Sequence, residues 1–193
     1  MKTKWLIIAA FLPLYSLCQT KKNCGCLQGL ISAGVVGGQS AAKPLLQAGA
    51  GFGQDAYYAG LGMGFDHYFL RSIPVFAEGR YQLLKGTPVF VYGQLGYNIP
   101  YNNHNDIDMI PASVTNHYRG GFYMDAGVGY WLLLARKQRI GISAGYSRKD
   151  LSNRQVSSFC VIAPCSQSAS EFRYSLGRML AKLSWSWGHS AKH

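Results

Sequence analysis

Apolar residues alternate with glycine or polar residues along several stretches of this chain. In the clearest stretch, residues 57–66, every second residue from Tyr57 to Phe65 is apolar, and the residues between them are tyrosine, three glycines and Asp66. Successive side chains of a β-strand point to opposite faces, so the pattern predicts a strand with one apolar face and one face of small or polar groups. Such a strand needs an apolar environment on one side only.

Alternation and turn signals together predict eight strands. They cover residues 28–36, 45–54, 56–68, 73–84, 88–99, 119–133, 138–149 and 171–187, each boundary being approximate. Three connections on one side are brief, and the two long polar connections, 100–118 and 150–170, fall on the other side. An even number of strands with this asymmetry is typical of bacterial outer-membrane barrels. We therefore expect an all-β fold, an eight-stranded antiparallel transmembrane β-barrel.

The first 18 residues have the pattern of an export signal. Lys2 and Lys4 precede an apolar run over residues 5–14, and residues 16–18 form a small-x-small cleavage site. We expect a signal peptide over 1–18 and a single barrel domain over 19–193. Lipidation of Cys18 is the alternative, although the residues before it fit a lipoprotein signal poorly.

The chain is strongly basic, with a formal net charge of +11. Cleavage after residue 18 leaves 17 basic residues against 8 acidic ones. No recognisable nucleic-acid module accompanies this charge, so we expect no nucleic-acid partner. Basic residues are favourable beside anionic lipid headgroups, and outer-membrane lipid is the partner that we expect.

The strand phases direct several charged side chains into the barrel. The predicted lumen charge network consists of Glu78, Arg80, Asp125, Arg139 and Arg178. Buried charges are costly unless they are paired, so we expect structural ion pairs here rather than catalytic groups or an ion path. Together with Tyr123 and Trp131, these side chains should fill the narrow interior of an eight-stranded barrel, which predicts no general pore.

The last predicted strand changes its phase. Phe172, Tyr174 and Leu176 share one phase, whereas the apolar residues from Met179 onward share the opposite one. A β-bulge at Gly177 would absorb the slip. Alternatively, the residues before Gly177 lie beyond the bilayer, where alternation is not required.

Four cysteines remain after cleavage, in two pairs that are far apart in the sequence. Cys160 and Cys165 are expected to form a disulfide, because the chain is exported to an oxidising compartment. Cys24 and Cys26 either stay reduced or cross-link to a partner. The spacings within the two pairs fit a zinc site poorly, so no metal is expected there.

Several motifs resemble the small outer-membrane β-barrel proteins of Gram-negative bacteria, in particular the Bacteroidetes type related to OmpX/OmpA-like eight-stranded barrels. The motifs are residues 71–80, 90–97, 120–123 and 127–130. The resemblance implies the bacterial outer membrane as the location and the barrel-insertion machinery as a partner. Trp185 and Trp187 are the expected insertion signal, although residues 188–193 follow them.

The resemblance carries barrel-building motifs and no catalytic motif, so we expect a monomer with a structural or surface-interaction role. The long outer connections could contact an extracellular partner. An outer-membrane lipid-modifying or proteolytic enzyme is the alternative, for which His67, Asp66 and His117 are the available groups. Asp66 and His67 are adjacent on a strand and point to opposite faces, so no catalytic residue is assigned.

Two further alternatives concern cations and fold. His104, Asp106 and Asp108 could offer ligands to a hard cation, but the glycine and closing glutamate of a calcium loop are missing, so we expect a solvated loop with no metal or cofactor. A soluble lipocalin-like barrel would place apolar side chains inside and polar ones outside, which is opposite to the faces predicted here.

Overall fold

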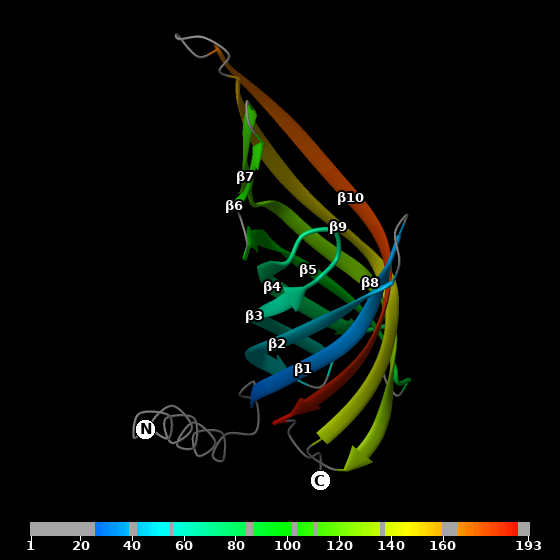
Figure 1. Cartoon of the computed structure of the whole chain (residues 1–193). Helices are drawn as coiled ribbons and strands as arrows, with labels where there is room; N and C mark the ends of the chain where they lie inside the picture. Colours follow the sequence, from blue (N-terminus) through cyan, green and yellow to red (C-terminus); the bar gives the residue numbers. More distant parts are fainter. Residues whose placement is uncertain are drawn as a thin grey trace, which may run out of the picture.

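The computed structural model describes residues 26–38, 42–54, 56–83, 87–101, 104–109, 112–135, 138–159 and 166–188. These residues form one antiparallel sheet of ten strands (Figure 1). The strands are β1 (Cys26–Gly37), β2 (Lys43–Gln54), β3 (Tyr57–Asp66), β4 (Ser72–Gln82), β5 (Val89–Pro100), β6 (His104–Met109), β7 (Ala112–Arg119), β8 (Gly121–Ala135), β9 (Gln138–Phe159) and β10 (Ser166–Trp187). In these ranges there is no helix that is long and apolar enough to cross a membrane.

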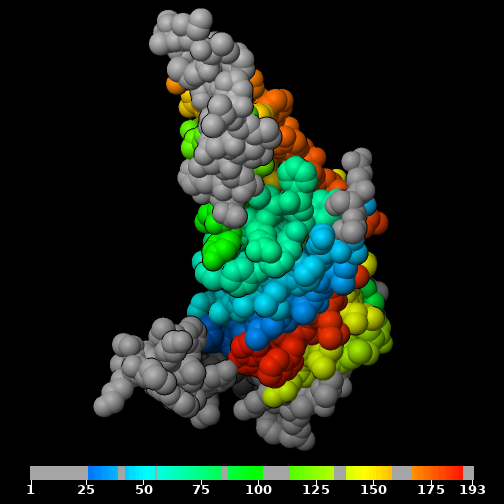
Figure 2. Space-filling model, viewed as in Figure 1, coloured from blue at the N-terminus to red at the C-terminus, as the bar shows by residue number. Residues whose placement is uncertain are grey.

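Eight of the strands close into a barrel. The sheet runs β1, β2, β3, β4, β5, β8, β9 and β10 in order, and β10 returns to pair with β1, with Ala33 opposite Leu183. Figure 2 shows β10, β1 and β2 lying side by side across one face of the molecule. The predicted all-β, eight-stranded antiparallel barrel is confirmed.

The two ends of the barrel differ in their connections. The β2–β3, β4–β5 and β8–β9 connections are brief and lie at what we call the turn end. At the opposite end, which we call the hairpin end, β9 and β10 continue beyond the barrel as a hairpin with 22 residues in each strand (Figure 1). The β6–β7 hairpin pairs with this extension, with His117 opposite Arg154.

Two expectations about the hairpin end were wrong. Most of the segments 100–118 and 150–170 were predicted as loops, but their described residues are largely paired strands. Both faces of this extension lie outside the barrel, so neither face needs to be apolar. The sequence therefore lacks the alternation of apolar and polar residues by which the other strands were predicted. The pairing of β9 with β10 is also unbroken past Gly177, which contradicts a bulge there and agrees with the alternative that Phe172 and Tyr174 lie beyond the barrel.

The two faces of the barrel wall are as the sequence predicts. Apolar side chains point outward, and Leu61 and Met63 are 71% and 59% exposed. Residues of the opposite phase point inward, where Gln94 and Asn98 are buried. A polar interior with an apolar exterior contradicts the lipocalin-like alternative.

Candidate functional site

Charged, amide and aromatic side chains from the barrel strands gather in the lumen. Among the described residues, seven charged side chains are buried there: Asp66, Glu78, Arg80, Asp125, Lys149, Arg178 and Lys182. Each of the seven takes part in an ion pair. Pairing offsets the large desolvation cost of burying a charge. The charged side chains of the lumen therefore bind one another and do not line an open channel.

An aromatic layer closes the lumen toward the turn end. Phe90 stacks on Trp131 with ring centroids 4.5 Å apart, and both pack with Leu30 and Tyr92. The guanidinium group of Arg80 lies 5.4 Å from the centroid of each of the two stacked rings. This arrangement gives the Arg80 charge a cation–π contact in addition to its ion pair.

Glycines on neighbouring strands make room for this layer. A β-carbon added to Gly129 would lie 2.3 Å from the Phe90 ring, and one added to Gly141 would lie 2.7 Å from the Trp131 ring. The inward glycines of the alternating pattern are therefore packing partners of the lumen aromatics. Any larger residue at these two positions would displace the rings.

The centre of the lumen is organised around Asp125 and Lys182. The Lys182 ammonium group lies 2.7 Å from a carboxylate oxygen of Asp125 and donates a hydrogen bond of 3.3 Å to Gln47. The Tyr92 hydroxyl donates to the other oxygen of Asp125 at 3.0 Å. Both carboxylate oxygens of Asp125 are thus engaged.

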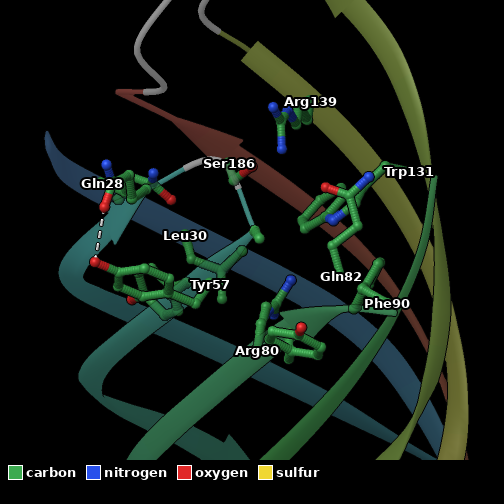
Figure 3. Close-up of a pocket in the computed structure, with 14 residues that line it drawn as sticks. Gln28, Leu30, Tyr57, Arg80, Gln82, Phe90, Trp131, Arg139 and Ser186 are labelled. Carbon is green, nitrogen blue, oxygen red and sulfur yellow. Dashed lines mark hydrogen bonds between the residues drawn. The ribbon is translucent and has the colours of Figure 1, made fainter. Parts of the chain in front are cut away.

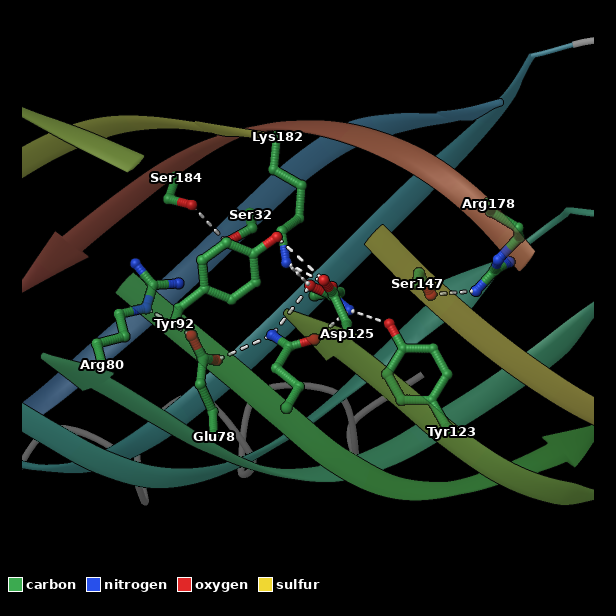
Figure 4. Close-up of polar contacts among 12 residues, drawn as sticks. Ser32, Glu78, Arg80, Tyr92, Tyr123, Asp125, Ser147, Arg178, Lys182 and Ser184 are labelled. Atoms are coloured by element: carbon green, nitrogen blue, oxygen red, sulfur yellow. Dashed lines mark hydrogen bonds and ion pairs between the residues drawn. The ribbon is translucent and has the colours of Figure 1, made fainter. Parts of the chain in front are cut away.

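Two glutamines connect this centre to a second ion pair, Glu78 with Arg80. Figure 4 labels the residues of both ion pairs. Gln47 donates to Gln94 at 3.0 Å and to the Tyr123 hydroxyl at 2.9 Å, and Gln94 donates to Glu78 at 3.1 Å. Glu78 in turn accepts from Arg80 at 2.5 Å. One continuous hydrogen-bonded network therefore crosses the lumen.

A third cluster lies toward the hairpin end. Arg178 pairs with Asp66 and donates to the Ser147 hydroxyl at 2.8 Å, while Lys149 lies 3.5 Å from the same Asp66 carboxylate. The backbone N–H of Tyr68 also donates to Asp66, at 2.8 Å. One carboxylate thus anchors two cations and the start of the β3–β4 turn.

The β3–β4 turn is tied down over the hairpin end of the lumen. Lys149 donates to the carbonyl oxygens of Tyr68 at 3.2 Å and Leu70 at 2.8 Å, and to the Ser72 hydroxyl at 2.6 Å. Phe69, between them, has a left-handed backbone with φ of 62°, which is unfavourable for an aromatic residue. The apolar cap under this turn consists of Val36, Leu45, Tyr68 and Leu180.

The predicted lumen residues do not all pair with one another. Glu78 and Arg80 pair with each other, whereas the partners of Asp125 and Arg178 are Lys182 and Asp66. Arg139 is half-buried at the turn end and lines a cavity of about 30 Å³, across from Arg80 (Figure 3). That volume holds only a few water molecules.

The predicted charge network omitted three of its participants. Lys182 and Lys149 are in the inward phase of their strands, and Asp66 shares its phase with the inward glycines of β3. The phase alone could therefore have identified all three. The phase also directs Gln47 and Gln94 inward, but the amide link between them had no signal in the sequence, because it depends on which inward side chains meet across the lumen.

The remaining predicted residues lie outside the lumen network. Trp185 points outward, and its ring centroid lies 5.3 Å from that of Trp187. Cys160 and Cys165, and the predicted signal 1–18, fall outside the described residues. Cys26 is disulfide-bonded, so it is not a reduced thiol in this structure, and the other cysteines of the chain lie outside the described part.

The groups considered for catalysis are not brought together, and the side chains considered for a cation lie outside the described ones. His104, Asp106 and Asp108 lie on β6, whose backbone alone is described, and no cluster of three potential metal-binding side chains occurs in the described ranges. His67 is exposed, whereas Asp66 is buried and held by Arg178. The proposed enzymatic groups Asp66 and His67 therefore face opposite sides of the barrel wall.

The described fold resembles a solved outer-membrane barrel. The outer membrane protein AlkL, solved by solid-state NMR in DMPC lipid bilayers, matches with a TM-score of 0.55 and 9% identity over 88% of this chain and 92% of that chain. The translocator domain of the autotransporter NalP from Neisseria meningitidis shares 10% identity over 94% of each chain, but its TM-score of 0.20 is too low to indicate a common arrangement. No protein-family model and no curated protein sequence matches this chain.

Proposed function

We propose that the protein is a small integral barrel of the bacterial outer membrane with a structural or surface-interaction role and a closed lumen. The observation that carries this proposal is the distribution of side chains on the barrel wall, which is opposite to that of a water-soluble protein. Apolar side chains lie outside and paired charges lie inside. In water this arrangement would expose a wide apolar surface, whereas in a bilayer it places that surface against hydrocarbon. The motifs that resemble Bacteroidetes-type, OmpX/OmpA-like barrels support the same location.

The filled lumen favours a scaffold over a pore. A solute entering from the turn end would meet the Phe90 and Trp131 stack, and one entering from the hairpin end would meet the β3–β4 turn. Between these two closures lie the ion pairs of the network. Displacing any of these charges would leave a partner buried and uncompensated, so thermal opening of a continuous path is unfavourable.

The hairpins beyond the barrel are the parts available for a surface role. From Lys149 to Phe159, β9 continues for a length of about 33 Å at the usual rise per residue. This extension would project from the cell and could contact an extracellular partner. Within the barrel wall itself the strands have no open edge, which favours a monomer, and Trp185 and Trp187 would serve the insertion machinery.

Fractionation combined with gel mobility tests this proposal. The full chain, expressed in a Gram-negative host, should appear in the outer-membrane fraction, and its unheated band should migrate differently from its boiled band. A closed barrel resists detergent until it is heated, which explains the shift. Recovery as a soluble periplasmic protein with one mobility would contradict the proposal.

A further inference from the structure

Arginines gather on the outward face of the β9–β10 extension and of β7. Arg119 on β7 and Arg173 on β10 both lie opposite Ser152 of β9, so the three residues form one row across three strands. Neighbouring strands are about 4.8 Å apart, which places the α-carbons of the two arginines about 10 Å apart. Arg154 and Arg148 share the outward phase of β9 with Ser152, and all four arginines are exposed.

Acidic partners offset only part of this charge. Asp150 lies 3.1 Å from Arg148, and Glu171 lies 3.5 Å from Arg173. Within the described residues, Arg119 and Arg154 have no carboxylate at ion-pair distance. The row and its neighbours therefore keep an excess of two positive charges on one face.

The arginines begin where the apolar exterior ends. On β9, the outward residue before Arg148 is Tyr146, which is 47% exposed, and on β10 the apolar phase ends with Met179, which is 70% exposed. Beyond these residues the outward positions are polar, charged or glycine as far as Arg154 on β9 and Glu171 on β10. The order along the strands is therefore an apolar surface followed directly by arginines.

An open depression lies farther along the same outward face. It has a volume of about 700 Å³ and is lined mainly by apolar side chains, among them Val35, Val128, Ile142, Ala144, Ala181 and Leu183. From Ala181, which lines the depression, to Arg173 the distance along β10 is about 26 Å. For a strand tilted by about 40° this corresponds to about 20 Å along the bilayer normal, which is half of the roughly 40 Å that a bilayer spans with its headgroups.

We propose that this face binds a phosphate-bearing anionic lipid of the surrounding leaflet, with the phosphate held by Arg119 and Arg173 and an acyl chain lying in the depression. Guanidinium groups donate several hydrogen bonds in a planar fork that fits phosphate oxygens. The separation between the depression and the arginines matches the separation between the chain ends and the phosphate of a lipid. The inference rests on the proposed location in a membrane.

Native mass spectrometry of the full chain tests the proposal. The folded protein is released from micelles that contain equal amounts of phosphatidylglycerol and phosphatidylcholine, and the retained lipids are counted. We expect phosphatidylglycerol to be retained preferentially. Since each basic residue near an anionic lipid surface contributes about fivefold, the R119Q/R173Q double variant should lose this preference by about 25-fold.

Two comparisons make the result specific. The K43Q/R71Q variant removes the same charge from exposed positions on β2 and in the β3–β4 turn, and it should keep the preference. The R119K/R173K variant keeps the charge but lacks the planar fork, so it should recover only part of the binding that the glutamine variant loses. An equal loss in both glutamine variants, or no loss in either, would overturn the proposal.

The lipid and a soluble phosphate are separated by competition. If glycerol 3-phosphate at the same concentration competed as well as the phospholipid, the site would be one for a soluble phosphate and the proposal would be wrong. Heat-dependent gel mobility of every variant verifies that the barrel is folded before lipids are counted. A wild-type chain that fails to insert into bilayers would contradict the proposed function itself, whereas one that inserts without lipid preference would contradict only this inference.

Discussion

Asp66 on β3 and Arg178 on β10 form a fully buried ion pair across the lumen, although they are 112 residues apart in the chain. The pair connects a strand near the start of the barrel with the strand that closes it. Lys149 on β9 joins the same carboxylate, so three strands meet at one negative charge. Closure of the barrel thus includes a specific electrostatic contact in addition to the backbone pairing of β1 with β10.

Replacing Arg178 by methionine should destabilise the barrel. The change leaves Asp66 buried with only the more distant Lys149 to compensate it, and breaking a buried pair typically costs about 3–5 kcal/mol. The Arg173→Met variant is the matched control, because its side chain is 84% exposed on the same strand, and its effect should stay within about 0.5 kcal/mol. The measurement is the urea concentration at which the folded, unheated gel band disappears. Equal midpoints for the two variants would show that the pair does not stabilise the fold.

Replacing Lys149 by methionine should loosen the β3–β4 turn. The change removes the donor to the carbonyl groups of Tyr68 and Leu70, and the left-handed backbone of Phe69 would no longer be held in place. We expect faster amide hydrogen exchange over residues 68–71, with unchanged protection in β1 and β2. Arg148→Met, at the adjacent exposed position, should leave the exchange of the turn as it is. Unchanged exchange in Lys149→Met would mean that the turn is held by its apolar cap alone.

An arginine in place of Leu61 should be poorly tolerated. Leu61 is 71% exposed on the outward face of β3, and a charged side chain near the bilayer midplane costs about 2–4 kcal/mol. Ser175→Arg introduces the same residue on the outward face of β10 beyond the apolar surface, where the expected cost is small. Folding free energies measured in lipid vesicles compare the two. If both variants are as stable as the wild type, the apolar exterior does not contact hydrocarbon.

The period-two pattern predicted the barrel strands because each of them separates hydrocarbon from a polar interior. The same reasoning could not find β6, β7 or the outer halves of β9 and β10, since polar residues occur on both faces there. Asp66 and Lys149 were identifiable from their phase, but the contact of Asp66 with both Lys149 and Arg178 depends on the register of the strands and on the position of the β3–β4 turn. The local alternation of residues therefore predicts whether a side chain points into the lumen. Which partner it meets there is decided only when the strands pair in register and the barrel closes.

The cysteines provide a test of topology. Cys26 begins β1 at the turn end, and Cys24 comes two residues earlier in the sequence. Cys160 and Cys165 fall in the sequence between Phe159 of β9 and Ser166 of β10, two residues that lie at the hairpin end. The apolar band of an outer-membrane barrel is roughly 25 Å tall, and a disulfide needs α-carbons within about 7 Å. Peptide mapping without reduction should therefore find Cys160 bonded to Cys165. A fragment that links the first pair to the second within one chain would contradict the barrel topology.

Electrical recording from the folded chain in planar lipid bilayers tests the central claim most directly. The account predicts insertion without a steady conductance, because the stacked rings of Phe90 and Trp131, the Asp125–Lys182 pair and the Asp66–Arg178 pair close the lumen at successive levels. Insertion is verified in the same preparation by the heat-dependent gel shift. A stable, porin-like current from the inserted wild-type protein would contradict the closed lumen and with it the proposed scaffold role.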